Sequence, residues 1–391
     1  METARRRWTF KMTPVRGLFL LIALIALAIV LVRLVLGLGA TTNLNDQWPW
    51  GFWISFDVLI GVALAGGGYG IALIVYVLRR DGFYPIARSA MLTSLLGYVI
   101  VVLGLLIEVG QWFNFYQPFI SWGHHSVLFE VFWCISMYTL IQVLEFCEIA
   151  TEKIFRGAHG LLKAIMPVLL VIGITLPTLH QSSLGGLYYE MIGKLDALWW
   201  SPLLPPFFLL SSFLVGPAMI VLETALSARV TKHVVPLPVL RGLVRISAVA
   251  LLIYFIAKIG DLLVAGELGG AFAGTFASNM FLLELGLGCL VPLLLFFGGA
   301  CAKRGGLILY GICVVAGVVM NRFNVVMTGM GEYLNRAGGQ YFPSWTEFVV
   351  SAGLVCIACL IYLFIVENFN IVGEPGHGEE QSRQEGKFVT D

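Results

Sequence analysis

Long apolar stretches separated by short polar connections occupy almost the whole chain. Each is about long enough to cross ~30 Å of hydrocarbon as an α-helix rising 1.5 Å per residue. Their apolarity is continuous, whereas the strands of a membrane barrel would alternate over about ten residues. The pattern predicts an all-α polytopic membrane protein of about ten transmembrane helices. They are expected at 16–38, 53–78, 86–110, 126–147, 161–178, 202–226, 240–263, 276–299, 305–322 and 345–367.

The composition agrees with burial in a lipid bilayer. Of the 391 residues, 59% are hydrophobic and 12% are charged, against roughly 25% charged in soluble domains. The formal net charge of +1 argues against the basic surface that nucleic-acid binding needs. The first apolar run, near Val15–Gly37, is longer than the core of a signal peptide, about 7–15 residues. We therefore expect it to be retained as a helix.

Lysine and arginine residues are distributed very unevenly between the two sets of connections. One set, which includes both ends of the chain, carries eighteen of them, and the other carries only Lys194 and Arg336. Because cytoplasmic loops are enriched in Lys and Arg, both termini are predicted to be cytoplasmic. The polar tail after Glu367 is predicted to be disordered.

The connections on the opposite side are long and aromatic. They span 43–53, 111–126, 180–201, 264–278 and 324–345. They favour a docking face for a partner protein. The alternative is that their tryptophans only form the interfacial belt common to membrane proteins.

Several carboxylates fall inside the predicted helices, where an ionised group costs at least about 2.5–3.5 kcal/mol at the membrane centre. A set near one depth is suited to bind and deprotonate a quinol or to pass protons on. The alternative is that they are wetted helix ends or pair with Arg33 or Lys258, the latter three residues before Asp261. The outer set is Asp57, Glu108, Glu130, Asp261 and Glu284, and Glu145 and Glu223 lie toward the cytoplasm.

A spacing of about 154 residues relates the two halves of the chain. It predicts a parallel internal repeat of two four-helix bundles in the same orientation. The domains expected are an N-terminal cytoplasmic segment (1–15), a flanking helix (16–38), a first bundle with its outer loops (53–200), a second bundle (201–344), a final helix (345–367) and the tail (368–391). The pairs are Glu108 with Asp261 (153 apart), Glu130 with Glu284 (154) and Gly61 with Gly216 (155).

Metal and haem ligands are poorly represented. The six histidines (124, 125, 159, 180, 233 and 377) fall in loops or at predicted helix ends, whereas b-type haem needs axial ligands inside the helices. The seven cysteines lack metal-ligand spacing and are read as packing residues. No phosphate loop, catalytic triad spacing or His-Glu-x-x-His motif is present. A haem-free, metal-free chain is predicted.

One segment carries a family resemblance. Thr175-Leu-Pro-Thr-Leu-His-Gln-Ser-Ser-Leu-Gly-Gly-Leu187 resembles the Pro-Thr-x-His-Gln-Ser-Ser-x-Gly segment of the NrfD/polysulfide-reductase membrane-subunit superfamily. More closely, the chain is similar to the integral membrane subunit of quinone-reducing NiFe hydrogenase-2 type complexes. The supporting segments are 44–57, 126–130 and 340–348. The similarity extends over nearly the whole chain, including ten helices where many members have eight.

The resemblance implies a haem-free quinone-binding subunit of a respiratory oxidoreductase in the bacterial inner membrane. A periplasmic iron–sulfur subunit and the NiFe hydrogenase large and small subunits would be its partners, with electrons passing from hydrogen to menaquinone, in some members coupled to proton translocation. The family's functional glutamates correspond to Glu130 and Glu223. Here Glu223 precedes Thr224-Ala225 rather than Gly-Ser. Polysulfide- and DMSO-reductase-type complexes share this membrane module, so the electron donor stays open.

A quinone site follows from these residues. His180 and Gln181 are expected to end the fifth helix, with Ser182, Ser183 and Gly185 forming a tight polar turn. The head group would lie between this turn and the carboxylates Asp57, Glu108 and Glu130. The alternative for His180 is a cap at the helix C-terminus, favoured by the helix dipole.

A cytoplasmic proton path would use Glu223 and Glu145 and then Glu130. Between Glu145 and Glu130 it must bridge about 22 Å along one helix. The main rival function is a secondary ion or solute transporter, whose sites should lie near the midplane on broken helices. A purely structural anchor would not need five buried carboxylates.

Overall fold

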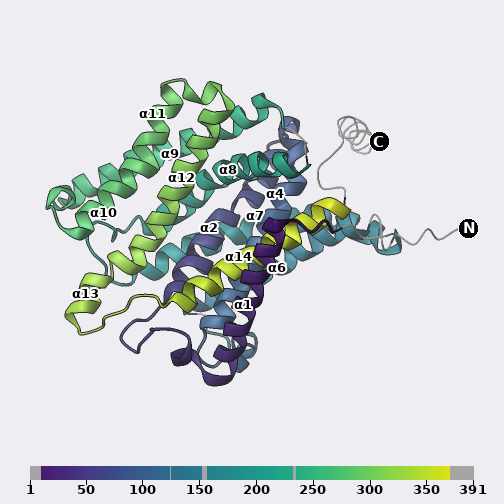
Figure 1. Ribbon diagram of the computed structural model, residues 1–391. Coiled ribbons are helices and arrows are strands. Elements are labelled where there is room, and N and C mark those ends of the chain that lie inside the picture. Colours follow the sequence, from purple (N-terminus) through teal and green to yellow (C-terminus); the bar gives the residue numbers. More distant parts are fainter. Residues whose placement is uncertain (1–9, 124, 152–155, 232–234, 370–391) are drawn as a thin grey trace, which may run out of the picture.

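Helices make up the protein throughout the described residues, which are 10–123, 125–151, 156–231 and 235–369 of the computed structural model. Within these ranges ten helices are long and apolar enough to cross a membrane, and no strand is present (Figure 1). The predicted all-α polytopic class and the ten helices are confirmed. Most of the predicted N-terminal segment, residues 1–9, and the tail from residue 370 lie outside the described residues.

Seven of the ten spans are uninterrupted helices in the described part of the chain. A hydroxyl cap starts the first, because Thr13 Oγ1 accepts the N–H of Arg16 at 3.3 Å. Gly266, at φ 75°, ends the helix Leu237–Ala265 with the left-handed geometry that glycine favours. The seven are α1 (Pro14–Leu36), α4 (Tyr84–Glu108), α6 (Val127–Thr151), α7 (Arg156–Tyr189), α8 (Leu204–Thr231), α9 (Leu237–Ala265) and α14 (Trp345–Asn368).

Three spans are composite and contain π-helical turns, which often occur at functional sites. The second span joins η2 (Ile54–Ile60), α2 (Gly61–Ala65), α3 (Gly67–Ala72) and η3 (Leu73–Val77). The eighth joins α10 (Phe276–Leu285), η7 (Gly286–Leu290) and α11 (Val291–Phe297), and the ninth α12 (Arg304–Phe323), η9 (Asn324–Thr328) and α13 (Gly331–Arg336). Short helices in the connections are η1 (Leu38–Ala40), η4 (Asp81–Phe83), η5 (Trp112–Asn114), α5 (Gln117–Ile120), η6 (Gly270–Phe272) and η8 (Ala300–Ala302).

The fifth and ninth spans are longer than predicted. The prediction ended the fifth at 178, next to Pro177, but α7 contains both Pro167 and Pro177 and runs on to Tyr189. Prolines are tolerated inside membrane helices because neighbouring groups satisfy the freed backbone, and α7 packs against both α6 and α8. The ninth extends past 322 because a π-helical segment continues it.

The central spans contact one another as two rings of four. Spans two to five pack in sequence and close through α3 against α7, and spans six to nine close through α8 against α12. The rings meet where α8 crosses the second span. There a Cβ on Gly216 would lie 2.8 Å from the Cα of Gly67, so the crossing needs small residues. The internal repeat of two four-helix bundles stays a prediction.

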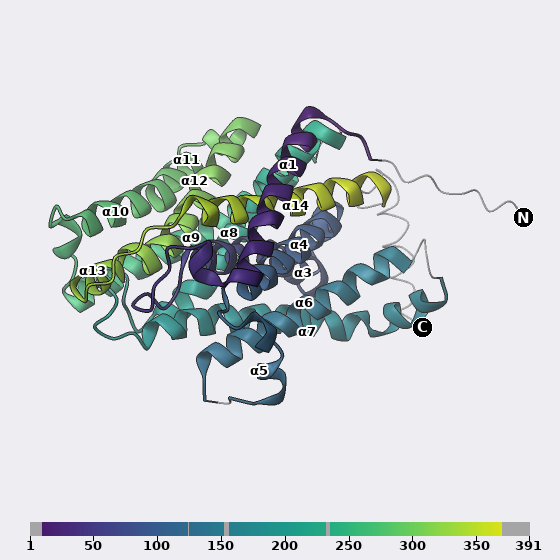
Figure 2. The ribbon, with the colours of Figure 1, turned by 60° about the horizontal axis from the view of Figure 1, so that its bottom comes forward.

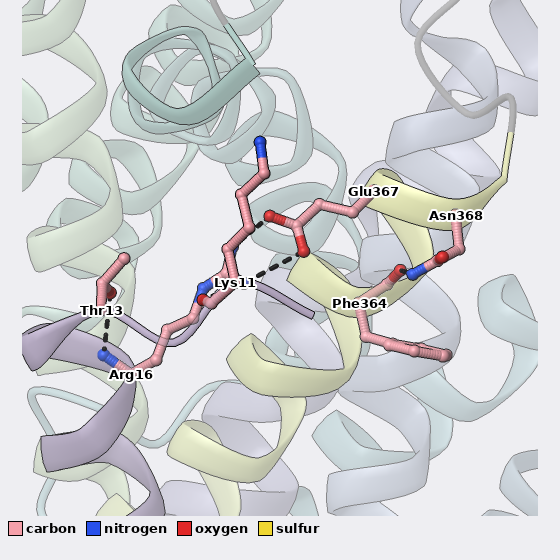
Figure 3. A network of polar contacts seen from close by, with 6 residues as sticks. All are labelled: Lys11, Thr13, Arg16, Phe364, Glu367 and Asn368. Carbon is pink, nitrogen blue, oxygen red and sulfur yellow. Dashed lines mark hydrogen bonds and ion pairs between the residues drawn. The ribbon is translucent and has the colours of Figure 1, made fainter. Parts of the chain in front are cut away.

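The flanking helices α1 and α14 lie side by side (Figure 1) and α14 rests on α4. Arg16 and Glu367 join their ends through two hydrogen bonds of 3.0 and 2.6 Å, and Arg16 also donates to the carbonyl of Lys11 (Figure 3). The start of the first span and the end of the last therefore lie at one end of the helix set, called the inner end below. The opposite, outer end carries α5, which projects from the spans in Figure 2.

Candidate functional site

The carboxylate of Glu108 holds the start of the second span at the outer end. One of its oxygens accepts the backbone N–H of Gly51 at 2.5 Å and the other accepts that of Ile54 at 2.7 Å. The first N–H groups of a helix have no partner within the helix. Here the carboxylate of Glu108, at the end of α4, accepts two of them. With both oxygens engaged, Glu108 acts as a positioning residue.

Asp57 lies one turn deeper and is less fully bonded. Its side chain is 2% exposed, and one oxygen accepts the hydroxyl of Ser351 from α14 at 2.7 Å. The other oxygen has no hydrogen-bond partner among the described residues. A Cβ on Gly104 would lie 2.7 Å from the Cβ of Asp57, so α4 presses directly on this side chain. Asp57 is thus a buried acid with capacity to take a further hydrogen bond.

Glu347 completes this outer cluster and was missed in the sequence analysis. It is 1% exposed and accepts the N–H groups of Asn43 and Ser344 at 3.0 and 2.9 Å and the hydroxyl of Tyr341. Burial, followed by the neighbouring Glu347, raises the pKa of Tyr341, so its phenol stays a donor. The Ser344-x-x-Glu347 capping box is a sequence signal that predicts this arrangement.

His180 lies inside α7 rather than at its end, and it is fully buried. Its Nδ1 is 3.0 Å from the carbonyl oxygen of Leu176, and since a carbonyl only accepts, Nδ1 carries the proton. Nε2 then accepts the hydroxyl of Tyr98 at 2.7 Å. Both ring nitrogens are occupied, which leaves the imidazole no free contact for a ligand in this arrangement.

The predicted polar turn after His180 is wrong, because α7 remains helical there. Ser183 donates its hydroxyl to the carbonyl of Leu179 at 3.0 Å, and Ser182 is half-buried. Gly185 marks a helix crossing, since a Cβ there would lie 2.5 Å from the carbonyl oxygen of Leu204. The start of α8 packs against this part of α7 and favours the continued helix.

Gln181 and Tyr188 are buried polar residues without partners. Neither amide atom of Gln181 nor the hydroxyl of Tyr188 has a hydrogen bond within 3.5 Å among the described residues, although the Gln181 amide lies near the hydroxyl of Tyr98, and both side chains are 0% exposed. Seven residues apart, they share one face of α7. Trp50 meets the ring of Tyr188 edge-on at 5.3 Å. Because an unmade buried hydrogen bond costs about 1–3 kcal/mol, such groups mark a place where a ligand can bind.

A series of polar side chains continues inward from His180. Tyr98 packs edge-on against Tyr138, with ring centroids 4.5 Å apart. The amide of Gln142 donates to the hydroxyl of Tyr138 at 3.0 Å and to that of Ser94 at 2.6 Å. All of these side chains are buried. They occupy the interior between α4 and α6, where the sequence prediction left a gap of about 22 Å.

Glu145 and Glu223 extend the series toward the inner end. Glu145, on α6 three residues after Gln142, is buried beneath Gly173 of α7, where an added Cβ would be 2.9 Å from its Oε1. Glu223 of α8 is buried and accepts the hydroxyl of Tyr362 at 2.9 Å, while its second oxygen has no partner in the described part of the chain. The predicted inner position of both acids agrees with the fold.

Two of the predicted outer acids are not in the interior. Glu130 lies in the first turn of α6 with its side chain exposed, and Asp261 is only half-buried. The prediction of five buried carboxylates at one depth is therefore wrong. Periodicity assigns residues to a helix, but it does not tell which face points into the bundle when both faces are apolar.

Glu284 is buried in the second ring of helices and is fully bonded. Its oxygens accept the indole N–H of Trp199 at 3.0 Å and the amides of Asn321 and Asn324 at 2.8 and 2.9 Å. Arg322 donates to Asn321 at 2.8 Å and lies 3.6 Å over the ring of Phe208. The acid and the cation thus belong to one network, in which both oxygens of Glu284 are bonded and Arg322 Nε has no hydrogen-bond partner among the described residues.

Lys258, also buried, lies over aromatic rings instead of pairing with Asp261. Its Nζ is 5.4 Å from the ring of Phe207 and 5.8 Å from that of Phe281, and no ion pair within 4.0 Å joins it to an acid in the described ranges. A cavity of about 20 Å³ lies beside Glu284 and Tyr254. It has room for about one water molecule, and this small volume argues against a solute pathway there.

No three His, Cys, Asp or Glu side chains converge on a possible metal position in the residues that the structure describes. His180 offers no free ring nitrogen, and His125 and His159 are exposed and half-buried, respectively. These side chains do not fit the axial ligation of a haem inside the membrane.

Comparison with known proteins identifies similar membrane subunits. The family model described as "Polysulphide reductase, NrfD" matches residues 40–331. The "Probable Ni/Fe-hydrogenase 2 b-type cytochrome subunit" of Escherichia coli is 33% identical over 354 residues, 88% of each chain. The "Menaquinone reductase, integral membrane subunit" of Nitratidesulfovibrio vulgaris is 28% identical over 359 residues, 83% of each chain. The "Hdr-like menaquinol oxidoreductase integral membrane subunit" of Archaeoglobus fulgidus is 22% identical over 367 residues, 85% of this chain and 87% of the relative.

Proposed function

The chain belongs to the NrfD family, and from this premise we propose that it is the quinone-reacting membrane subunit of a respiratory oxidoreductase. Its substrate is a quinone, with menaquinone as the candidate suggested by the name of the N. vulgaris relative. Reduction of the quinone to a quinol consumes two electrons and two protons. The protein's part is to bind and orient the head group and to deliver the protons.

The observation that carries this proposal is the set of buried, unpartnered polar atoms in the first ring of helices. Toward the outer end they are the amide of Gln181, the hydroxyl of Tyr188 and one oxygen of Asp57, and toward the inner end they are Thr93 Oγ1 and Gln142 Oε1. Quinone carbonyl oxygens accept hydrogen bonds, and the amide and the phenol are donors. Asp57, when protonated, donates as well. The head group is placed against Gln181 and Tyr188, with Glu108 holding the backbone beside them.

His180 has a different role from the one predicted for it. Since its ring is bonded to Tyr98 and Leu176, we assign it to proton transfer rather than to direct quinone contact. The series Glu145, Gln142, Tyr138 and Tyr98 leads to it from the inner end, and Glu223 stands near the start of that series. We further propose that this series takes part in proton translocation. Glu130, exposed at the outer end, remains a predicted residue for proton exchange there.

Electrons must arrive from another subunit. In the described residues no set of side chains suits a metal centre, and we extend this to the proposal that the chain carries neither haem nor metal. The name of the E. coli relative includes a b-type cytochrome, so an absorption spectrum of the purified subunit tests this point directly. A haem Soret band at stoichiometric strength would contradict it.

The proposed partners dock on the outer end, where the aromatic connections lie. They are a periplasmic iron–sulfur subunit and, by similarity to the E. coli relative, the large and small subunits of a NiFe hydrogenase. A polysulfide- or DMSO-reductase-type partner is the alternative. The excess of basic residues at the inner end supports cytoplasmic termini in a bacterial inner membrane.

The test uses membranes that contain the whole complex. Turnover is followed with a menaquinone analogue and, separately, with an artificial dye that takes electrons from the partner subunit. We expect Asp57→Asn to slow the quinone reaction about 100-fold, as loss of a general acid does, and Gln181→Leu to slow it about tenfold through the lost hydrogen bond. Dye reduction should not change.

Two exposed residues provide matched controls. Asp46→Asn and Gln117→Leu make the same chemical changes on outer connections. Because these connections also face the proposed partner, the quantity compared is the ratio of quinone to dye turnover, which should stay as in the wild type. Wild-type quinone turnover in both Asp57→Asn and Gln181→Leu would refute the proposed site.

A further inference from the structure

A cavity of about 260 Å³ opens at the inner end of the second ring of helices, far from the outer acid cluster. The first turns of α9, the end of α11, η8 and the start of α12 form it. Arg241 and Arg245 line one part, and Val244, Phe296 and Leu307 line another. The cavity therefore combines guanidinium groups with an apolar wall at a level where the spans end.

The surroundings of this cavity are strongly basic. Lys303 and Arg304 follow η8 directly, and the segments 235–260 and 285–331 contain no Asp or Glu. Asp261 lies 16 residues beyond Arg245 on the same helix, about 24 Å away at 1.5 Å per residue. Four cations thus gather here without a nearby carboxylate from the segments that form the cavity.

The hydrogen-bonding capacity of these groups is largely unused. Arg245 is exposed and makes no hydrogen bond or ion pair with any described residue, whereas Arg241 donates to the carbonyl of Ala302 through one nitrogen only. No side chain caps the N-terminus of the 20-residue helix α12. In its first turn, Gly305 has no heavy atom within 4 Å of an added Cβ, whereas Gly306 packs against the carbonyl of Ala300 in η8.

We propose that this cavity binds the head group of an anionic glycerophospholipid. The phosphate accepts hydrogen bonds from the arginine side chains, since a guanidinium group can bind phosphate in a bidentate manner. Basic pockets between membrane helices on the cytoplasmic side are suited to such head groups. The apolar wall continues onto the exposed side chains of Leu294 and Phe297, which are 70% and 67% exposed and lie in α11, where acyl chains would run.

The apolar wall distinguishes a lipid from a free phosphate ion. An inorganic anion gains nothing from Phe296 and Leu307, whereas an acyl chain gains favourable free energy from each methylene that it buries. The position at the helix ends also matches the depth of head groups in the membrane. The lipid therefore suits both the basic and the apolar part of the cavity lining. Its phosphate compensates charges that no acid from the segments forming the cavity neutralises.

The experiment measures lipid binding to the purified full-length protein in neutral detergent after delipidation. Phosphatidylglycerol, phosphatidylcholine and inorganic phosphate are added separately, and bound lipid is counted by native mass spectrometry while the thermal midpoint is recorded. Phosphatidylglycerol should bind saturably and raise the midpoint, and the other two probes should not. Arg245→Gln should weaken binding about fivefold and the double variant with Arg241→Gln about 25-fold, given about 1 kcal/mol per basic residue.

Arg80→Gln is the matched control, because Arg80 is an exposed arginine at the inner end outside the cavity. It should bind phosphatidylglycerol like the wild type. Arg245 has no protein partner to lose, so its substitution tests the site without disturbing the fold. Wild-type retention of phosphatidylglycerol in the double variant, or equal retention of phosphatidylcholine, would overturn the proposal. So would displacement of the lipid by inorganic phosphate at similar concentration.

Discussion

Asp57 in the first ring of helices and Glu284 in the second are both buried carboxylates, but their surroundings differ. Asp57 accepts one hydrogen bond, from Ser351, and keeps one oxygen free. Glu284 accepts three, from an indole and two amides, and buried Arg322 bonds the same Asn321. A carboxylate held by donors on both oxygens is fixed in place. One with a free oxygen can gain a proton or a ligand.

The same contrast holds for the neighbouring polar groups. In the first ring, the side chains of Gln181 and Tyr188 make no hydrogen bond within 3.5 Å, whereas around Glu284 the two amides and the indole all donate to the carboxylate. If the two rings are repeats, as the spacing of about 154 residues predicts, the buried acid compared here is fully bonded in one copy and has an unfilled hydrogen-bonding position in the other. The difference suggests a division into a stabilising unit and a reacting unit.

The largest expected effect is on stability, from the same amide substitution at the two sites. Glu284→Gln puts an amide N–H₂ where a carboxylate oxygen accepts the donors of Trp199 and Asn324, and a buried donor left without its acceptor costs about 1–3 kcal/mol. Asp57→Asn keeps the hydrogen bond to Ser351 and should cost less than about 1 kcal/mol. Thermal unfolding of both variants in one detergent measures the difference. Equal midpoints would remove the distinction between the two units.

The ten spans could be predicted because lipid burial requires long apolar runs, and the runs are visible in the sequence. The ends of the fifth and ninth spans were harder to predict. Pro177 is a helix breaker in water, but inside a membrane bundle α7 passes through it. The ninth span continues through a π-helical turn, a feature that has no clear sequence signature.

The candidate site was predicted in part. Asp57 and Glu108 do lie together, because a helix end and a helix start meet at the outer end. The predicted turn at Ser182, Ser183 and Gly185 is wrong for the same reason as the predicted end of the fifth span, because α7 continues through Pro177. Glu130 could not be placed, since α6 is apolar on all faces and only packing decides that its first turn points outward. Whether Gln181 has a hydrogen-bond partner depends on how the folded helices pack, so it cannot be predicted from the sequence.

An intermediate effect is expected from interrupting the polar series in the first ring. Tyr98→Phe removes the donor to His180 Nε2 and should cost about 1 kcal/mol of stability and slow quinone turnover about tenfold, within the range of a proton-transfer group. Turnover in heavy water supplies the discriminating measurement. The solvent isotope effect should rise in the variant, because proton delivery becomes limiting.

Tyr333→Phe is the control for that change. Tyr333 is 43% exposed on α13, and removing its hydroxyl should alter neither turnover nor the isotope effect. An unchanged isotope effect in Tyr98→Phe would show that protons reach the first ring by another route.

The smallest effect is expected at Glu130, and it bears on whether the first ring acts through its interior. The family resemblance gives this residue a functional role, yet its side chain is exposed on α6. At a wetted surface, water can replace a carboxylate in proton exchange, so Glu130→Gln should slow quinone turnover only about twofold, the scale of a surface change, with dye reduction intact. A loss as large as that of Asp57→Asn would show instead that the quinone reacts at the outer surface of α6, and the interior site at Gln181 would have to be abandoned.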